Sequence, residues 1–595
     1  MTAPRLRTLA DLVFHLAETQ KGREHLVSWQ EGRERLWLST EEWVARVHAL
    51  ALALEERGVG KASRVAIFSE NRPEWHITEF ACQLLGAITV PLYPTLPADQ
   101  VRYILHNARC GCILYSDKAK AEILADVRAQ LTRPLSCIAF ESEAATEPDP
   151  HLQELLDRGF QLASATPLET LRSRSKEDDP ASLIYTSGTT GNPKGVTLTH
   201  RNLVSNILAC SDLFELGPKD LSLSFLPLSH VFQRTVDNLF LYKGVSIHYV
   251  KSIDRVPRAL TEIQPTLLAS VPRLYERAYL RVQNNLEKES AAKKRIFAWA
   301  IGVGARYHEA RSAGHVALHL AAQRRLAHRL VFSKIHERMG GRLRLAITGG
   351  AALPEKVGRF FGAIGLDLFE GYGLTETSPV LVLARPGATR WGSIGQAIPG
   401  VELRIADDGE ILAKTPGLMQ GYWDNDEATA EAIDAEGWFH TGDVGELDSD
   451  GFLKITDRKK DLIVTSGGKN IAPQPIEQLL TATGVISYAV VIGDNYPYLT
   501  ALLVPNLEDL PPELAELSPE ERITQPRLLE RIEATVAEVN GKVAEHERIR
   551  RWKLLPRELT LDDRELTPTL KVRRRFVLER YSDLVSSMYL KSQRI

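Results

Sequence analysis

Short apolar runs alternate with segments of helical periodicity between residues 64 and 116, and this pattern restricts the fold more than any other feature. Strands are expected at 64–68, 87–93 and 110–116, and helices at 74–86 and 98–108. Pro73 falls in the expected first turn of the first helix, where its fixed φ and missing N–H are tolerated. Short connections between alternating strands and helices favour a parallel sheet covered by helices. The sequence therefore predicts an α/β fold.

The rest of the chain extends this pattern and then changes it. At roughly 150 residues per domain, 595 residues correspond to about four domain-sized units. Residues 141–180 are polar and acidic, and we expect them to form an exposed excursion before the next strand. From about Asp457 onward the sequence predicts a smaller α/β region, with strands at 487–493 and 500–505 and a basic tail.

Charge and hydropathy narrow the classes of protein to which the chain can belong. Lys and Arg number 73 and Asp and Glu number 76, so the net charge of −3 argues against a nucleic-acid-binding protein. No apolar run reaches the length of a membrane helix, and the first residues lack the pattern of a secretory signal. These features predict a cytoplasmic protein. Residues 272–344 hold 16 Lys and Arg against 5 Asp and Glu, which fits peripheral membrane contact or a solvated helical surface equally well.

Five cysteines in so long a chain predict no disulfide framework. The Cys110-Gly111-Cys112 sequence raises the question of zinc. No second Cys or His pair follows at ligand spacing, so packing within a strand is the favoured interpretation.

A loop rich in hydroxyl groups follows the apolar run 183–185 and carries the strongest chemical signal. Its residues are Thr186, Ser187, Gly188, Thr189, Thr190 and Gly191, and Lys194 comes three positions later. Glycines let backbone N–H groups approach phosphate oxygens, hydroxyls donate further hydrogen bonds, and the lysine adds positive charge. A Walker loop requires Lys directly after the last glycine, and here Asn-Pro intervenes. The pattern predicts a polyphosphate-binding loop of another kind.

The string TSGTTGNPKG resembles the phosphate loop of the adenylate-forming superfamily, which includes acyl-CoA synthetases, peptide-synthetase adenylation domains and firefly-type luciferases. The likeness extends from about Thr8 to Arg575. It implies a large N-terminal domain, residues 1–456, with parallel-sheet α/β subdomains and a small β-rich subdomain. It also implies a hinge at 457–460 and a small mobile α+β C-terminal domain at 461–595.

Further motifs supply candidate nucleotide ligands. The segment 370–377, EGYGLTET, follows an apolar strand and presents an aromatic ring, a hydroxyl and a carboxylate on what we expect to be one loop. Tyr372 can stack on a purine, Thr375 can bond a phosphate, and Glu376 offers the hard oxygen that Mg²⁺ prefers. The resemblance implies the same roles and adds Thr190 as a second magnesium ligand.

Two more segments complete the predicted nucleotide site. Gly350 and Ala351 end a buried strand, where small residues allow close approach of a flat ring; a helix-entry turn explains them equally well. Asp443, in an expected tight loop, can accept hydrogen bonds from both ribose hydroxyls, and the resemblance assigns it that role. Arg458 then contacts the ribose or a nearby phosphate.

The resemblance also assigns the moving parts of the site. Lys571, in the sequence LTPTLK, matches the mobile lysine that neutralises charge between the carboxylate and the α-phosphate. The wider superfamily has Gly before this lysine, whereas this chain has Leu570, a departure shared by the long-chain branch. Lys460 matches the hinge. Gly467, Gly468 and Lys469 match a loop that meets the thiol acceptor in a second conformation.

The segment 226–234, LPLSHVFQR, resembles a motif of the long-chain fatty-acid branch that often reads L-P-L-A-H-x-x-E-R. His230 is then expected near the carboxylate and the mouth of an acyl tunnel, although a lone His is as readily a buried structural residue. Ser229 and Gln233 stand where that branch often has Ala and Glu.

The predicted activity is ATP-dependent ligation of a long-chain fatty acid to CoA, with Mg²⁺ as cofactor. The catalytic set is Lys571, Glu376, Thr375 and His230. Two alternatives stay open at this stage: a fatty acyl-AMP ligase that loads a carrier protein, and a non-catalytic acyl- or nucleotide-binding protein. The oligomeric state is not predicted.

Overall fold

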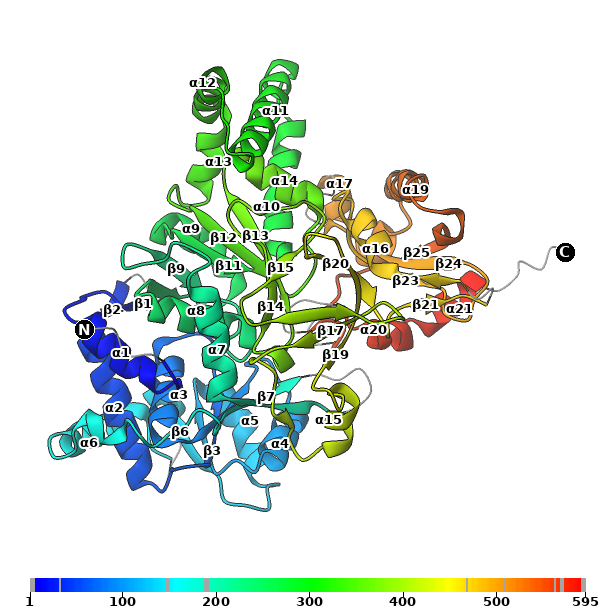
Figure 1. The fold of residues 1–595 in the computed structure, drawn as a ribbon. Helices are drawn as coiled ribbons and strands as arrows, with labels where there is room; N and C mark the ends of the chain where they lie inside the picture. Colours follow the sequence, from blue (N-terminus) through cyan, green and yellow to red (C-terminus); the bar gives the residue numbers. More distant parts are fainter. Residues whose placement is uncertain are drawn as a thin grey trace.

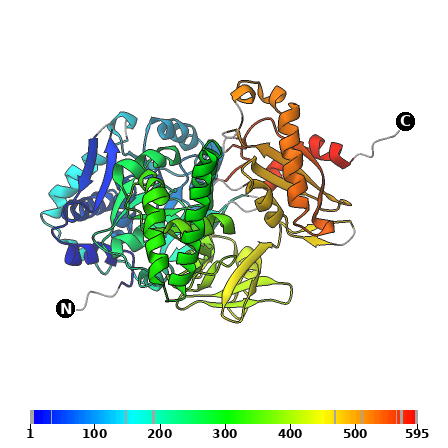
Figure 2. The same ribbon diagram turned by 90° about the horizontal axis from the view of Figure 1, so that it is seen from above.

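The computed structural model describes residues 6–31, 34–145, 149–186, 192–466, 469–507, 510, 512–560, 563–567 and 572–589. These residues form an N-terminal α/β body and a smaller C-terminal region that lies to one side of it (Figures 1 and 2). Within the described part of the chain, no helix is both long and apolar enough to cross a bilayer.

Two large sheets build the N-terminal body. Among the described residues the first sheet has 13 strands. In spatial order they are β16 (Glu402–Ile405), β17 (Glu410–Lys414), β19 (Phe439–Leu447), β20 (Phe452–Arg458), β15 (Gly395–Ala397), β14 (Val380–Leu383), β13 (Asp367–Gly373), β12 (Leu345–Gly349), β11 (Leu267–Ser270), β9 (Leu221–Ser224), β10 (Ser246–Tyr249), β1 (Val27–Glu31) and β2 (Glu34–Leu38). The run from β13 to β1 is parallel, whereas β14 to β20 pair antiparallel and make its β-rich end.

The second sheet has seven strands among the described residues. Their order is β18 (Gly421–Tyr422), β8 (Lys194–Thr199), β7 (Pro180–Thr186), β4 (Ile88–Leu92), β3 (Arg64–Phe68), β5 (Cys112–Tyr115) and β6 (Ser136–Ala139). The strands β7, β4, β3, β5 and β6 are parallel. The expected strand–helix alternation at 64–116 is confirmed, and α3 begins at Pro73 as predicted.

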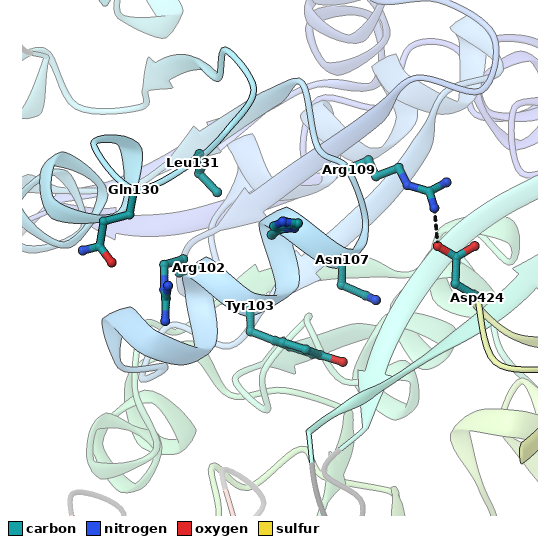
Figure 3. Close-up of a pocket in the computed structure, with 8 residues that line it drawn as sticks. Arg102, Tyr103, Asn107, Arg109, Gln130, Leu131 and Asp424 are labelled. Carbon is teal, nitrogen blue, oxygen red and sulfur yellow. Dashed lines mark hydrogen bonds and ion pairs between the residues drawn. The ribbon is translucent and has the colours of Figure 1, made fainter.

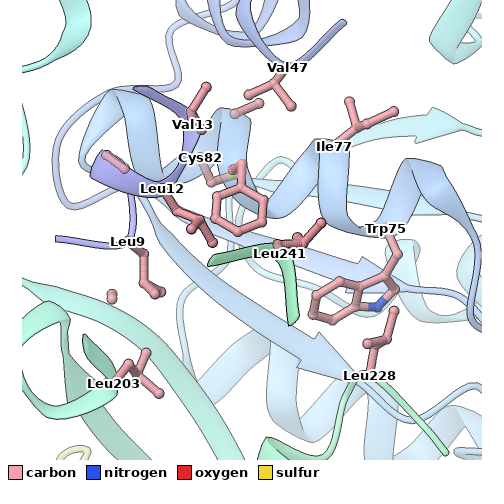
Figure 4. Close-up of a cluster of buried hydrophobic side chains, with 14 of the residues drawn as sticks. Leu9, Leu12, Val13, Val47, Trp75, Ile77, Cys82, Leu203, Leu228 and Leu241 are labelled. Carbon is pink, nitrogen blue, oxygen red and sulfur yellow. The ribbon is translucent and has the colours of Figure 1, made fainter. Parts of the chain in front are cut away.

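Helices cover both sheets. Those of the N-terminal body are α1 (Asp11–Thr19), α2 (Thr40–Glu56), α3 (Pro73–Leu85), α4 (Ala98–Asn107), α5 (Lys118–Arg128), α6 (Leu152–Ala163), α7 (His200–Ser211), α8 (Val231–Tyr242), α9 (Val256–Ile263), α10 (Pro272–Glu287), α11 (Ala291–Ser312), α12 (Leu318–Ala327), α13 (Ser333–Arg338), α14 (Glu355–Ile364) and α15 (Asp426–Ala432). Leu9, Leu12, Val47, Trp75 and Leu241 meet in the core where α1, α2, α3 and α8 converge (Figure 4). Burial of such apolar side chains is the main force that holds these layers together.

The segment 141–180 differs from its prediction. It is not an exposed excursion, because α6 buries Leu152, Leu155, Leu156 and Gly159. A Cβ atom at Gly159 would lie 2.0 Å from the Ala49 carbonyl oxygen of α2, so only glycine allows this approach of the two helices.

The C-terminal region has hydrophobic clusters of its own, formed by residues from Ile463 onward. Its elements are β21 (Ile463–Val464), β22 (Asn470–Ile471), α16 (Pro473–Thr481), β23 (Ile486–Ile492), β24 (Leu499–Pro505), α17 (Pro512–Ala515), α18 (Pro519–Arg522), α19 (Pro526–Asn540), β25 (Ile549–Leu554), α20 (Arg574–Arg580) and α21 (Ser582–Tyr589). The strands predicted at 487–493 and 500–505 are confirmed as β23 and β24, which pair antiparallel. Arg564 of this region forms a 3.2 Å ion pair with Asp99 of α4.

The five cysteines are all among the described residues, and all are buried and free. Cys112 lies in β5 and packs in the hydrophobic core on one side of that strand.

Candidate active site

A first group of predicted residues lies at the ends of β12 and β13, which are neighbouring parallel strands. In β12 and β13, Gly349 pairs with Gly371, and a Cβ atom at Gly349 would lie 3.2 Å from the Gly371 carbonyl oxygen. Gly350 follows with a φ of +83°, a conformation that favours glycine. Gly350 and Ala351 are exposed, so a ligand can approach their backbone.

Tyr372 lies within β13, which runs to Gly373. The expectation of one loop from Glu370 to Thr377 is therefore wrong: the strand pairs with β14 through Tyr372 and Gly373 before a 3₁₀ turn, η5 (Thr375–Thr377), begins. A pleated strand fixes the direction of its side chains more firmly than a loop does. Thr375 is 9% exposed at the start of the turn.

Asp443 of β19 contacts side chains from two other strands, β13 and β20. The Tyr372 hydroxyl donates a 2.7 Å hydrogen bond to Asp443 Oδ2, and Arg458 Nε lies 3.1 Å from Asp443 Oδ1. Asp443 belongs to β19 and pairs directly with Arg458 of β20, which corrects the expected tight loop. The irregular register of β19, where Gly442 has a φ of +72°, accounts for its loop-like sequence.

The charges of this group reinforce one another. Burial opposes the charge on Arg458, but Asp443 and Asp461 together raise its pKa above the usual value. Burial and then the Asp443 charge raise the pKa of Tyr372 well above its usual range, so its hydroxyl stays protonated and can donate. Asp443 is 5% exposed and has both carboxylate oxygens partnered.

A second group of predicted residues, Glu376 and Lys194, lies around the side chain of Tyr422. Its hydroxyl donates a 2.9 Å hydrogen bond to Glu376 Oε1, and Lys194 Nζ lies 5.0 Å from the centre of its ring. Strand β18, which carries Tyr422, pairs with β8 beside Val196. Glu376 and Lys194 thus lie close to the same ring. Burial raises the pKa of the Glu376 carboxyl, so a nearby cation would favour its ionised form.

Sequence reasoning missed Tyr422. The available signal was an aromatic pair, Tyr422-Trp423, directly after Gly421. Trp423 donates from its backbone N–H to the Gly195 carbonyl oxygen over 2.7 Å, which fixes this segment next to Lys194.

The phosphate loop joins two antiparallel strands. Thr186 ends β7 and pairs with Lys194 at the start of β8. Ser187, Gly188, Thr189, Thr190 and Gly191 lie outside the described residues, as do Gly467, Gly468 and Lys571. The predicted magnesium ligand Thr190 is among them.

His230 caps the N-terminus of α8, where its Nδ1 accepts from the Phe232 N–H at 3.1 Å. The Phe232 ring lies 3.5 Å from the position that a Cβ would take at Gly349. The start of α8 is therefore next to the end of β12. His230, at the N-terminus of α8, therefore lies near the predicted site at the end of β12.

A network of buried polar side chains is centred on Arg234, which follows His230 by one helical turn in α8. Arg234 and Glu79 form an ion pair and are 1% and 0% exposed. The Arg234 guanidinium also donates to Ser182 of β7 at 2.8 Å and to Thr89 of β4 at 3.0 Å. The network thus joins α8 to the strand that leads into the phosphate loop.

Lys460 lies in the turn after β20, between the N-terminal body and the C-terminal region. Its neighbour Lys459 pairs with Glu410 at 2.9 Å and with Asp408 at 2.6 Å. Asp457, before the turn, accepts from the Gln474 N–H of α16 at 3.2 Å. Lys469 is exposed between β21 and β22, which pair with each other in the C-terminal region.

An open hollow lies outside these groups. Figure 3 shows its lining on α4 and nearby loops, with the Arg109–Asp424 ion pair at one side. None of the predicted site residues lines it. The two groups around Asp443 and Tyr422 therefore remain the candidate site.

Comparison with known proteins finds two family models that together match most of the chain. The AMP-binding enzyme family matches residues 13–423, and the AMP-binding enzyme C-terminal domain matches residues 460–593. Long-chain-fatty-acid–CoA ligase FadD15 of Mycobacterium bovis is 37% identical over 98% of this chain and 97% of its own length. Long chain acyl-CoA synthetase 7, peroxisomal, of Arabidopsis thaliana is 30% identical over 98% of this chain and 87% of its own.

Solved structures share the fold. The adenylation domain of a carboxylate reductase from Mycobacterium chelonae has a TM-score of 0.79 at 21% identity, over 99% of this chain and 92% of that one. The anthranilate CoA ligase AuaEII, solved with anthranoyl-AMP, has a TM-score of 0.74 at 19% identity, over 99% of this chain and 100% of that one. On the extent of the family match, this chain belongs to the AMP-binding enzymes.

Proposed function

We propose that the chain is an ATP-dependent long-chain fatty-acid–CoA ligase. It activates a fatty acid as acyl-AMP with release of pyrophosphate and then transfers the acyl group to the CoA thiol with release of AMP. The observation that carries the proposal is the convergence of Tyr372, Asp443 and Arg458, together with the turn η5 that follows Tyr372 and lies against β8, the strand that begins just after the predicted phosphate loop. Relatives named as long-chain-fatty-acid–CoA ligases match over nearly the full length, which supports this choice of substrate.

The nucleotide is held by groups of complementary chemistry. Asp443 accepts hydrogen bonds from the ribose hydroxyls, and the Arg458 side chain that pairs with it helps to hold its carboxylate in place. Tyr372 offers a ring face to adenine, and the exposed backbone at Gly350 and Ala351 directly follows β12, the strand that pairs with the strand of Tyr372. Thr375 donates to a phosphate oxygen. The loop 186–191 supplies backbone and hydroxyl donors to the polyphosphate.

The residues present fit a magnesium ion. Mg²⁺ prefers carboxylate oxygen combined with substrate phosphates, and Glu376 is a half-buried carboxylate that contacts the same tyrosine, Tyr422, as Lys194 does. Thr190 is the second predicted ligand. When bound, the ion supplies positive charge at the phosphates.

The first half-reaction brings together two anions, so repulsion makes a large part of its barrier. Lys194, Lys571 and the loop N–H groups place positive charge where negative charge develops, and each such donor contributes on the order of 10²–10³ in rate. The loop that carries Lys571 is anchored at both ends, because Leu566 and Val572 form a β-bridge and the Arg573 N–H donates to the Glu565 carbonyl oxygen.

The second half-reaction requires another arrangement of the C-terminal region. We propose that the N-terminal domain is residues 1–456 and the C-terminal domain residues 461–595. Residues 457–460 then form the hinge, and rotation takes place at Lys460. The separate hydrophobic clusters of the C-terminal region support this division. Rotation removes Lys571 and brings the loop at Gly467, Gly468 and Lys469 towards the thiol.

Fatty-acid specificity is assigned to the region around His230. Each enclosed CH₂ contributes about 0.8 kcal/mol, so a closed tunnel could favour palmitate over octanoate by up to about 6 kcal/mol. Peripheral membrane contact through 272–344 is part of the same proposal, because long-chain acids partition into bilayers.

A panel of acids from acetate to oleate tests the proposal. Each acid is incubated with ATP, Mg²⁺ and either CoA or a holo-carrier protein, and thioester and pyrophosphate are measured. The expected result is CoA thioester with long acids. Thioester on the carrier alone would identify a carrier-loading enzyme, and absence of pyrophosphate with every acid would indicate a binding protein.

A further inference from the structure

Tyr422 contacts two charged side chains of opposite sign. Its hydroxyl donates to Glu376 Oε1 at 2.9 Å, and Lys194 Nζ lies 5.0 Å from the centre of its ring. Glu376 belongs to the turn η5 and Lys194 to the start of β8, so one aromatic side chain connects two separate segments of the candidate site. All three side chains are half-buried.

Strand pairing explains why the ring of Tyr422 reaches Lys194. Tyr422 of β18 is paired with Val196 of β8 in an antiparallel ladder. Lys194 precedes Val196 by two residues and therefore lies on the same face of β8. Diagonal neighbours of this kind are within reach of aromatic and long side chains. The contact is thus built into the register of the two strands.

The backbone around Tyr422 is fixed from two sides. The Met419 N–H donates to the carbonyl oxygen of Glu376 at 2.7 Å, which ties this segment to η5. The Tyr422 N–H donates to Thr429 Oγ1 of α15 at 2.9 Å. The ring and the carboxylate of Glu376 are therefore held relative to each other by main-chain bonds as well as by the hydroxyl.

We propose that Tyr422 is a positioning residue of the candidate site, a role that rests on the proposed function. Its hydroxyl orients the Glu376 carboxylate, and its ring face holds the Lys194 ammonium by a cation–π contact. A carboxylate has two oxygen atoms, so a hydrogen bond at Oε1 leaves capacity for a cation. Both charges are thereby ordered before Mg²⁺ and ATP bind.

The alternative is that Tyr422 only fills space between β8 and η5. A packing role depends on the ring and not on the hydroxyl. A positioning role towards magnesium depends on the hydroxyl, and removal of a group that orients a metal ligand lowers metal affinity by about 10- to 100-fold. The two roles therefore differ in how ATP binding responds to the metal.

The experiment measures binding of labelled ATP to the full chain by equilibrium dialysis, with excess Mg²⁺ or with EDTA. No acid and no CoA are present, so the readout does not depend on turnover. The unaltered chain should bind ATP more tightly with Mg²⁺, and the ratio of the two dissociation constants gives the metal-dependent gain. Tyr422→Phe should reduce this gain about tenfold and leave the value in EDTA unchanged.

Tyr422→Leu separates the ring from the hydroxyl. It should lose the same metal-dependent gain and also weaken ATP binding in EDTA about threefold, because Lys194 loses the ring face that holds it. Tyr422→Phe keeps that face and should not show this second loss. In a Glu376→Gln chain, Tyr422→Phe should have no further effect on the gain, since the carboxylate that the hydroxyl orients is absent.

Tyr498→Phe is the matched control. It removes the hydroxyl of a half-buried tyrosine of the C-terminal region, which donates to the Met588 carbonyl oxygen at 3.1 Å. Its ATP affinity should equal that of the unaltered chain in both conditions. Equal weakening by Tyr422→Phe with Mg²⁺ and with EDTA would assign Tyr422 to packing and overturn the proposal. An unchanged gain in Tyr422→Phe, or no gain in the unaltered chain, would overturn it as well.

Palmitate-dependent pyrophosphate release by the unaltered chain is measured in parallel. Its absence would contradict the proposed function, whatever the binding ratios are. Normal release by the unaltered chain, together with an unaffected metal-dependent gain in Tyr422→Phe, would contradict the positioning role alone.

Discussion

Asp443 is nearly fully buried, yet its carboxylate is held by two side chains that come from other strands. Its motif identified the residue, but not its partners, because pairing between β19 and β20 and the position of β13 depend on the whole sheet. The same limit explains why Tyr422 was missed. A sequence motif shows which side chains are present, whereas the contact of Tyr422 with Glu376 depends on the pairing of β18 with β8, whose partners Gly421 and Thr197 are 224 residues apart in the sequence.

Asp443→Asn tests the ribose assignment. The substitution keeps the size of the side chain but removes its charge and one acceptor, and a hydrogen bond to a charged group contributes about 1.5–3 kcal/mol. We expect the KM for ATP to rise about 10- to 100-fold in pyrophosphate release, while the KM for the fatty acid changes little. Asp450→Asn, on the exposed β19–β20 turn, is the control and should leave both values unchanged.

Arg234 carries a second prediction at this scale. Removal of one partner from a buried ion pair leaves an uncompensated charge, so Arg234→Met should lower the free energy of unfolding by about 3–5 kcal/mol. Glu79→Leu/Arg234→Met should recover most of that loss. Arg258→Met breaks an ion pair whose arginine is 74% exposed and should cost under about 1 kcal/mol. Equal losses for Arg234→Met and Arg258→Met in urea denaturation would contradict the role assigned to the network.

Gln233 illustrates how a motif departure can be explained once the fold is known. Its amide donates to Asp237 Oδ1 at 2.7 Å, and Ser224 donates to the other oxygen at 2.6 Å. Burial raises the pKa of Asp237 to about 7. A glutamate at 233 would place a second carboxyl group beside Asp237, and like charges at short range are unfavourable.

At the scale of elements, local patterns predicted the strands and helices of 64–116 because periodicity and Pro73 act within the segment itself. The segment 141–180 failed for the opposite reason. Its composition is polar and acidic, but the apolar stripe of α6 packs against α2, and the contacting residues Gly159 and Ala49 are 110 positions apart in the chain. Likewise, the irregular strands β13 and β19 read as loops because glycines interrupt them.

Gly159→Ala tests the close approach of α6 to α2. The added methyl group would meet the Ala49 backbone, so overpacking should lower the free energy of unfolding by about 1–3 kcal/mol. Gly302→Ala is the matched control, because it lies in the middle of α11 with open space around its Cβ position. That substitution should stabilise the helix by about 0.5–1 kcal/mol. Thermal melting of the two variants in opposite directions is the expected result.

At the scale of the whole molecule, the family match and the two-part architecture followed from motifs spread along the chain. The contacts between the C-terminal region and the N-terminal body could not be predicted from these motifs. The Arg564–Asp99 ion pair and the contact of Gly484 with Leu280 join residues from distant segments, and no motif marks them.

Lys460→Pro tests rotation about the hinge. The backbone N–H groups of Lys459 and Asp461 donate to the carbonyl oxygens of Gly442 and Arg458. Among the described residues the Lys460 N–H makes no backbone hydrogen bond. Proline at 460 therefore restricts backbone rotation without breaking a hydrogen bond. We expect normal acyl-AMP formation and at least a tenfold slower thioester step. Lys460→Ala removes the charge but keeps the freedom, and both steps should be normal. A slow thioester step in Lys460→Ala as well would assign the effect to the charge.

The most direct test of the account is a single-turnover reaction of enzyme, ATP, Mg²⁺ and palmitate in which CoA is added only after the first step is complete. Before CoA, we expect one pyrophosphate and one enzyme-bound palmitoyl-AMP per active site. After CoA, the adenylate should disappear as palmitoyl-CoA and AMP appear in equal amounts. Pyrophosphate that appears only after CoA is added, or thioester formed with no preceding adenylate, would contradict the two-step ligase that this structure supports.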